Sequence, residues 1–214
     1  MITYSYSSLK TYEQCPQKFK FGRIDKLPEP SGEAAERGKT LHSAIEANVK
    51  GETDILPIEI EHVRPSINEL KVMGAEAEKE FAIDLDWKPV SFFDKKARFR
   101  GIIDIYAKNG EKAIVLDWKS GKVRDYSDQV RVYAAVSFAL DDELQLVKPV
   151  IAFIDQKKEQ EYPSIPREVY PSIRADVERR MSAIDNDSVY APNPGFLCKW
   201  CHYRKSNGGP CRWA

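Results

Sequence analysis

The sequence holds one strong β-hairpin signal, the dipeptide Asn109-Gly110, between two segments rich in apolar residues, 97–107 and 113–118. An antiparallel pair at this point determines which face of a sheet each side chain occupies. Charged residues nevertheless lie inside both segments, and a charge in an apolar strand is costly to bury unless it is paired or binds a metal. The hairpin therefore predicts both a sheet and a chemical site on that sheet.

The charged residues of the hairpin are predicted to share one face. Because side chains alternate along a strand, Asp117 and Lys119 point the same way. The predicted turn places Asp117 opposite Ile102, with Asp104 on the same face and diagonal to Asp117, ~7–8 Å away at Cα. Two carboxylates and a lysine then converge, which suits Mg²⁺ binding and metal-assisted phosphodiester hydrolysis. The alternative is an ordinary hairpin with one salt bridge.

The remaining chain alternates helices and strands. Capping residues and apolar periodicity predict helices over 7–21 (capped by Ser7 or Ser8, interrupted near Cys15-Pro16), 32–50, 65–73, 126–140 and 165–184. Further strands are predicted over 81–85 and 150–154. This alternation is typical of an α/β domain, here with an irregular Pro-, Gly- and Cys-rich tail from Ala191.

Composition excludes several classes of protein. The 214 residues suit one domain, and 42% hydrophobic with 31% charged residues excludes a wholly disordered chain. The longest apolar runs, 132–136 and 150–154, are far shorter than the ~20 residues of a membrane span. The N-terminus lacks the features of a signal peptide, so we expect a cytoplasmic protein.

Charge is unevenly distributed along the chain. The 33 basic and 33 acidic residues cancel, which excludes a globally basic nucleic-acid binder. Residues 95–124 nevertheless contain nine basic and three acidic residues, and residues 196–214 contain four basic residues and no acidic one. These two stretches favour a polyanion as partner.

Four cysteines form the second candidate site. Cys198 and Cys201 are separated by two residues, Cys211 follows, and Cys15 lies near the other end of the chain. In a cytoplasmic protein this pattern favours a metal or cluster site over disulfides. Spacing alone leaves zinc and an iron–sulfur cluster open, with His202 a less favoured substitute for Cys211.

Five motifs in chain order resemble the RecB-like branch of the PD-(D/E)XK nuclease superfamily. They are residues 6–19 with Cys15-Pro16, Gly38-Lys39-Thr40-Leu41-His42, Gly101-x-x-Asp104, Asp117-x-Lys119-Ser120-Gly121-Lys122, and Gln129-x-x-x-Tyr133. The first motif is similar to that of the iron–sulfur members. One departure is Ile103, where the superfamily's name has proline, a residue that RecB-like members often lack.

The resemblance implies a restriction-endonuclease-like core, a central mixed sheet flanked by helices. Within one nuclease domain, residues 1–75 would form a helical N-terminal part, 76–185 the core, and 186–214 a Cys-rich tail. The tail would complete the site with Cys15.

The resemblance also implies roles for individual residues. His42, Asp104 and Asp117 would be metal ligands and Lys119 the catalytic lysine. Gln129 and Tyr133, four residues apart on one helix face, would contact DNA or support Lys119, although Tyr133 also suits a core position. The acidic position on the first strand would be Glu78, in preference to Glu80. Cys15, Cys198, Cys201 and Cys211 would hold a [4Fe–4S] cluster, with Zn²⁺ as the competitor.

The activity so implied is that of a Mg²⁺- or Mn²⁺-dependent DNA nuclease. It would be an exonuclease on single-stranded DNA or duplex ends, in phage or prokaryotic recombination or end-processing. One alternative is the iron–sulfur nuclease of CRISPR adaptation, and either setting would supply a protein partner. A second alternative is a nucleic-acid-binding iron–sulfur module without catalysis.

Overall fold

The computed structural model describes residues 2–213, which form two compact units. The sheet unit comprises residues 2–3 and 33–175, and the cysteine unit comprises residues 4–32 and 176–213. Each unit is described by itself. None of the helices in residues 2–213 is both long and apolar enough to cross a membrane.

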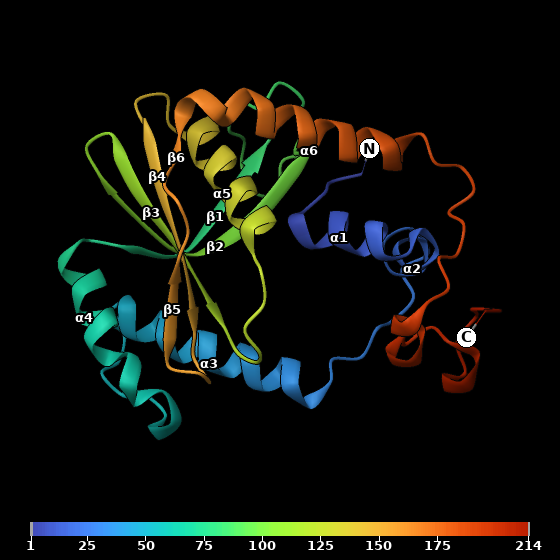
Figure 1. Ribbon diagram of the computed structural model, residues 1–214, viewed down its shortest axis with the longest axis horizontal. Helices are drawn as coiled ribbons and strands as arrows, with labels where there is room; N and C mark the ends of the chain where they lie inside the picture. Colours follow the sequence, from blue (N-terminus) through green and yellow to red (C-terminus); the bar gives the residue numbers. More distant parts are fainter. Residues whose placement is uncertain (1, 214) are drawn as a thin grey trace. The chain divides into compact units, whose positions relative to one another are not determined.

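The sheet unit is built on a mixed six-stranded sheet (Figure 1). Its strands are β1 (Glu76–Ile83), β2 (Phe99–Asn109), β3 (Lys112–Lys119), β4 (Leu146–Phe153), β5 (Lys158–Glu161) and β6 (Ile165–Pro166). The order is β1-β2-β3-β4-β5, with β6 also pairing with β4. Strands β3 and β4 are parallel, and the other pairs are antiparallel.

Helices cover both faces of this sheet (Figure 1). One face carries α3 (Glu33–Val49), a 3₁₀ turn (Ile58–Val63) and α4 (Arg64–Val72), and the other carries α5 (Ser127–Leu140). The core beneath α3 and α4 includes Leu41, Ile45, Ile60, Ile67, Leu116, Trp118, Val150 and Ala152. Beneath α5, Val130 packs on Ile151 and Phe153. The predicted α/β fold with a mixed sheet flanked by helices is confirmed.

The register of the central hairpin differs from the prediction. Asn109 pairs with Lys112, so the two-residue loop is Gly110-Glu111, with Gly110 at a φ of 59° that favours glycine. Ile105 then pairs with Leu116, and every partner shifts by two residues from the predicted register. Because the shift is even, the change of register alone does not move any side chain to the other face. Asp104 therefore comes directly across from Asp117 instead of diagonal to it.

Three boundaries also differ from the predictions. Strand β1 begins five residues earlier than the predicted strand over 81–85. Ile165–Pro166 pairs with β4 as β6, so the last helix, α6, covers only Tyr170–Asp185. The cap of the first helix is Ser5, because Ser8 occupies the third helical position and completes a reciprocal capping box with Ser5.

The cysteine unit contains the first helices and the tail. Helix α1 (Tyr6–Gln14) ends at Cys15, whose backbone is extended, and α2 (Pro16–Phe19) restarts with proline at its first position. A π-helical turn, Lys20–Ile24, follows. The tail contains two short 3₁₀ helices, Phe196–Trp200 and Lys205–Asn207. Tyr203 is buried and donates its hydroxyl to the Leu27 carbonyl at 3.1 Å, which anchors the tail within this unit.

Gly101 is required by the packing of β2 against the α5 side. A Cβ atom at this position would lie 2.7 Å from Phe81 Cζ, and the Phe81 ring is buried between Phe99 and Tyr133. We expect Gly101→Ala to lower the free energy of unfolding by about 1–3 kcal/mol through overpacking. Urea unfolding measures this. The control is Gly32→Ala, where a Cβ meets nothing within 4 Å, and equal stability of the two variants would contradict the prediction.

Candidate active site

The site lies where the β2–β3 pairing ends. Ile105 and Leu116 are the last paired residues, and Asp104 and Asp117 follow on opposite sides of the resulting split. The backbone N–H of Trp118 donates to Asp104 Oδ2 at 2.8 Å, in place of a strand-to-strand hydrogen bond. The Trp118 indole lies in the core under α3 and α4. The split therefore admits two carboxylates beside the buried apolar residues Ile105, Leu116 and Trp118.

Asp117 is fixed by partners on both of its oxygens. It is only 2% exposed, Lys119 Nζ forms an ion pair with Oδ2, and Gln129 Nε2 donates to Oδ1 at 2.7 Å. Gln129 Nε2 also donates to the Tyr133 hydroxyl at 3.0 Å. The spacing of four residues places Gln129 and Tyr133 on one face of α5. Tyr133 also packs its ring against Phe81, so it is both a core aromatic and a support for Gln129.

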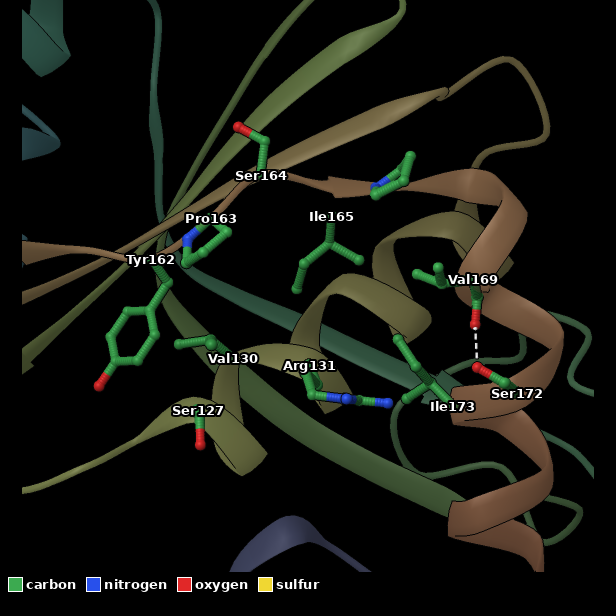
Figure 2. A pocket seen from close by; sticks show the side chains of 11 residues that line it. Ser127, Val130, Arg131, Tyr162, Pro163, Ser164, Ile165, Val169, Ser172 and Ile173 are labelled. Atoms are coloured by element: carbon green, nitrogen blue, oxygen red, sulfur yellow. Dashed lines mark hydrogen bonds between the residues drawn. The ribbon is translucent and has the colours of Figure 1, made fainter.

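Lys119 has a second neighbour that the sequence analysis missed. Its ammonium nitrogen lies 5.0 Å from the centroid of the Tyr126 ring, within cation–π range. The Tyr126 N–H donates to the Tyr162 hydroxyl at 2.8 Å, and Tyr162 lines a separate pocket of about 350 Å³ beside α5 (Figure 2). Tyr126 directly precedes α5, and no motif or periodicity marks it.

A second group of ligands faces Asp104 from α3 and β1. His42 Nδ1 lies 3.3 Å from Asp104 Oδ2, and ligand atoms of His42, Glu78 and Asp104 all lie within 4.8 Å of one another. They line a pocket of about 320 Å³ together with Gly38 and Glu46. The structure thus brings His42, Glu78 and Asp104 together, next to Asp117 and its lysine.

Gly38 both lines this pocket and allows a close approach between two segments. A Cβ atom at Gly38 would lie 2.9 Å from Ser120 Oγ, so the glycine lets α3 approach the Asp117-x-Lys119-Ser120 segment.

The backbone distinguishes Glu78 from Glu80. Glu78 has a φ of 51°, a left-handed conformation that costs a non-glycine residue on the order of 1–3 kcal/mol. Ala77 and Lys79 pair regularly with β2, while Glu78 faces Asp104 outside the regular ladder. Glu80 is exposed and pairs with Ile102. Glu78 is therefore the acidic residue of β1 that lines the pocket, and the strained backbone directs it there.

The electrostatics of this group fit a divalent cation. Burial raises the pKa of Asp104 well above its usual value, and the charge of Asp117 raises it further. Burial also raises the pKa of Asp117, although the charge of Lys119 lowers it. The pKa of Glu78 is likewise raised by burial. Burial lowers the pKa of His42, which favours the neutral imidazole that binds metals. Crowded carboxylates beside a neutral histidine are a suitable ligand set for Mg²⁺ or Mn²⁺, because a cation relieves their repulsion.

All four cysteines belong to the cysteine unit, and each is a free, half-buried thiol. The backbone N–H of Asn193 donates to Cys15 Sγ at 3.4 Å, and that of Gly195 donates to Cys198 Sγ at 3.3 Å. Burial raises the pKa of the Cys201 thiol, and the charges of Cys211 and Cys15 raise it further. Cysteine thiolates are ligands of both zinc and iron–sulfur clusters. Among residues 2–213, the group of three or more ligand atoms that lie within 4.8 Å of one another is that of His42, Glu78 and Asp104, and it includes no cysteine.

Comparison with known proteins adds the following. A family model described as the PD-(D/E)XK nuclease superfamily matches residues 3–69 and 59–206. The solved structure of SSO0001 is similar over 99% of this chain and 86% of its own, with 17% identity and a TM-score of 0.49. That of LHK-Exo in complex with dAMP is similar over 85% of each chain, with 13% identity and a TM-score of 0.42. No curated protein sequence matches the chain.

Proposed function

This chain belongs to the PD-(D/E)XK nuclease superfamily, and from that premise we propose that it is a Mg²⁺- or Mn²⁺-dependent deoxyribonuclease. We further propose that it is an exonuclease on single-stranded DNA or duplex ends, acting in recombination or DNA end-processing. The observation that carries the proposal is the convergence of Asp104, Asp117 and Lys119 at the split between β2 and β3.

Each residue of the candidate active site has a distinct role in this proposal. His42, Glu78 and Asp104 would hold the cation, with Asp117 beside them. A bound divalent cation supplies Lewis-acid polarisation of the phosphodiester. Lys119, positioned by Asp117 and Tyr126, would orient the attacking water and offset negative charge on the phosphate in the transition state. Gln129 keeps the Asp117 carboxylate in one orientation through its 2.7 Å hydrogen bond.

The test is a cleavage assay on DNA labelled at the 5′ or the 3′ end, single- or double-stranded, with Mg²⁺, Mn²⁺ or chelator. We expect metal-dependent release of nucleotides from linear DNA and resistance of circular single strands. Cleavage of the circles would contradict the exonuclease mode. Binding of DNA without any metal-dependent cleavage would instead favour the non-catalytic module.

Substitution of the proposed ligands should weaken metal binding. We expect His42→Ala and Asp104→Ala each to lower Mn²⁺ affinity at least about tenfold, because even the outer partners of metal ligands contribute 10–100-fold. Calorimetric titration measures this. Glu80→Ala is the matched control, since Glu80 is exposed and does not line the pocket. Unchanged affinity in both ligand variants would show that the ligands are wrongly assigned.

We also propose a [4Fe–4S] cluster on Cys15, Cys198, Cys201 and Cys211, with Zn²⁺ as the competing occupant. Two backbone N–H groups directed at sulfur support the proposal, because such bonds stabilise thiolates in clusters.

The cluster is compatible with two biological settings, recombination or end-processing and CRISPR adaptation, of which we favour the first. Each setting supplies a protein partner, and the genes that neighbour this one would distinguish them.

A further inference from the structure

The loop between β1 and β2 holds a large aromatic ring in solvent. Phe93 is 79% exposed, although the loop around it is well structured. The Val90 N–H donates to the Ala82 carbonyl at 2.9 Å, and the Asp94 carboxylate accepts the Lys96 N–H at 2.7 Å. A fixed loop therefore presents the ring outward without a further cost of ordering.

Arg100 joins this ring to the sheet. Its guanidinium carbon lies 5.0 Å from the Phe92 ring centroid and 5.4 Å from that of Phe93. Its Nη1 donates to the Phe92 carbonyl at 3.1 Å, and the two rings lie edge to face at 5.0 Å. Phe92, Phe93 and Arg100 form one unit, which we call the Phe93 platform.

The platform and the candidate active site lie on the same strand. Arg100, Ile102 and Asp104 are alternate residues of β2, and Ile102 between the other two is 37% exposed. Four residues of strand span about 13 Å. Since neighbouring phosphates of a nucleic-acid strand are at least ~3.4 Å apart, a strand with one phosphate at Asp104 reaches the platform within about four nucleotides.

The charge around the platform suits a polyanion. Lys95 and Lys96 are exposed, and among residues 2–213 neither ammonium group has a hydrogen-bond or ion-pair partner. They open the basic stretch 95–124 noted in the sequence. Exposed aromatic rings combined with cations are the features by which proteins bind single-stranded nucleic acids, since bases stack on the rings and cations contact the phosphates.

We propose that the Phe93 platform binds single-stranded DNA by stacking one base on the Phe93 ring, within about four nucleotides of the scissile phosphate. This proposal rests on the proposed nuclease function and specifies its substrate. Inside a duplex both faces of each base are covered by neighbouring bases, so away from the duplex ends only an unpaired base can lie on the ring. The platform therefore favours single strands and frayed ends over intact duplex.

The experiment compares Phe93→Ala, Phe93→Leu and Phe93→Trp in the full chain. We expect Phe93→Ala and Phe93→Leu to raise KM for a 12-nucleotide single strand about 5- to 100-fold, with kcat retained, as expected for the loss of one stacked base. Phe93→Trp should preserve KM. Turnover of a dinucleotide, which is too short to reach the platform, should be equal in all variants.

Three results would overturn the proposal. One is an unchanged KM for the 12-nucleotide strand in Phe93→Ala. Another is an equal loss of dinucleotide turnover, which would indicate damage to the active site. The third is retention of binding in Phe93→Leu, which would indicate an apolar contact such as that of a protein partner. If the wild-type chain cleaves no DNA, fluorescence anisotropy of labelled single strands still compares the variants, so failure of the nuclease proposal is distinguishable.

Discussion

Asp117→Ala and Lys119→Ala are each expected to lower kcat for DNA cleavage at least about 10²–10³-fold, while DNA binding persists. The reason is that the half-buried Lys119 and the buried Asp117 form an ion pair at the split between β2 and β3. Removal of a single group that stabilises developing charge commonly costs this much. Proteins that bind nucleic acids gain much of their affinity from phosphate contacts, and the proposed basic surface retains these in both variants, so DNA binding should survive.

Matched measurements separate catalysis from folding and binding. Lys158→Ala is the control, because Lys158 is an exposed cation of the sheet unit that lies outside both the ion pair and the basic stretch 95–124. It should cleave DNA at nearly the wild-type rate. Fluorescence anisotropy of labelled single strands should give similar affinities for all three variants, and melting temperatures should show that each is folded. Full Mg²⁺-dependent activity of both Asp117→Ala and Lys119→Ala would refute the assigned roles.

The central hairpin shows which features of the candidate site can be predicted from the sequence pattern and which cannot. Alternation along a strand places Asp117 and Lys119 on one face whatever the turn, so an even error in register leaves that face unchanged. The direct opposition of Asp104 and Asp117 depends on the true loop, Gly110-Glu111, and the dipeptide signal misplaces that loop by one residue. The pattern also assumes an unbroken ladder, so it does not predict the split in which the Trp118 N–H turns to Asp104.

Other features of the site depend on tertiary packing that local patterns do not encode. By strand alternation Glu78 and Glu80 share a face, and it is the left-handed backbone at Glu78 and its place in the pocket that separate them. Tyr126 lies under Lys119 because α5 starts directly after it and Tyr162 holds its N–H. The close approach of Gly38 and Ser120 brings together segments 82 positions apart, and no periodicity in the sequence predicts it.

The second large effect concerns the four cysteines. Cys15 and Cys198 are 183 positions apart, so one shared cluster closes a loop of nearly the whole chain. Loop closure constrains the unfolded chain more strongly as the loop lengthens, by about 4–5 kcal/mol for loops of ~100 residues. Over residues 186–213 the tail has two short 3₁₀ helices and one isolated β-bridge, Arg204–Cys211, so apart from the Tyr203 anchor its order should depend on the cluster. We expect anaerobically purified protein to be brown and to contain about four irons and four sulfides per chain.

Replacing any one of these cysteines by alanine should therefore remove more than colour. We expect lower solubility and a melting temperature lower by about 10–20 °C, the shift that a loss of 4–5 kcal/mol produces in a chain of this size.

His202→Ala is the matched control and should stay brown, because the cluster needs only the four thiolates. Asp117→Ala should also keep both colour and iron, since Asp117 lies in the sheet unit. If the protein is colourless and contains one zinc per chain, the loop-closure argument still holds, because zinc would also link the four cysteines. The iron–sulfur assignment would then be wrong. Four free thiols in a fully stable protein would overturn both.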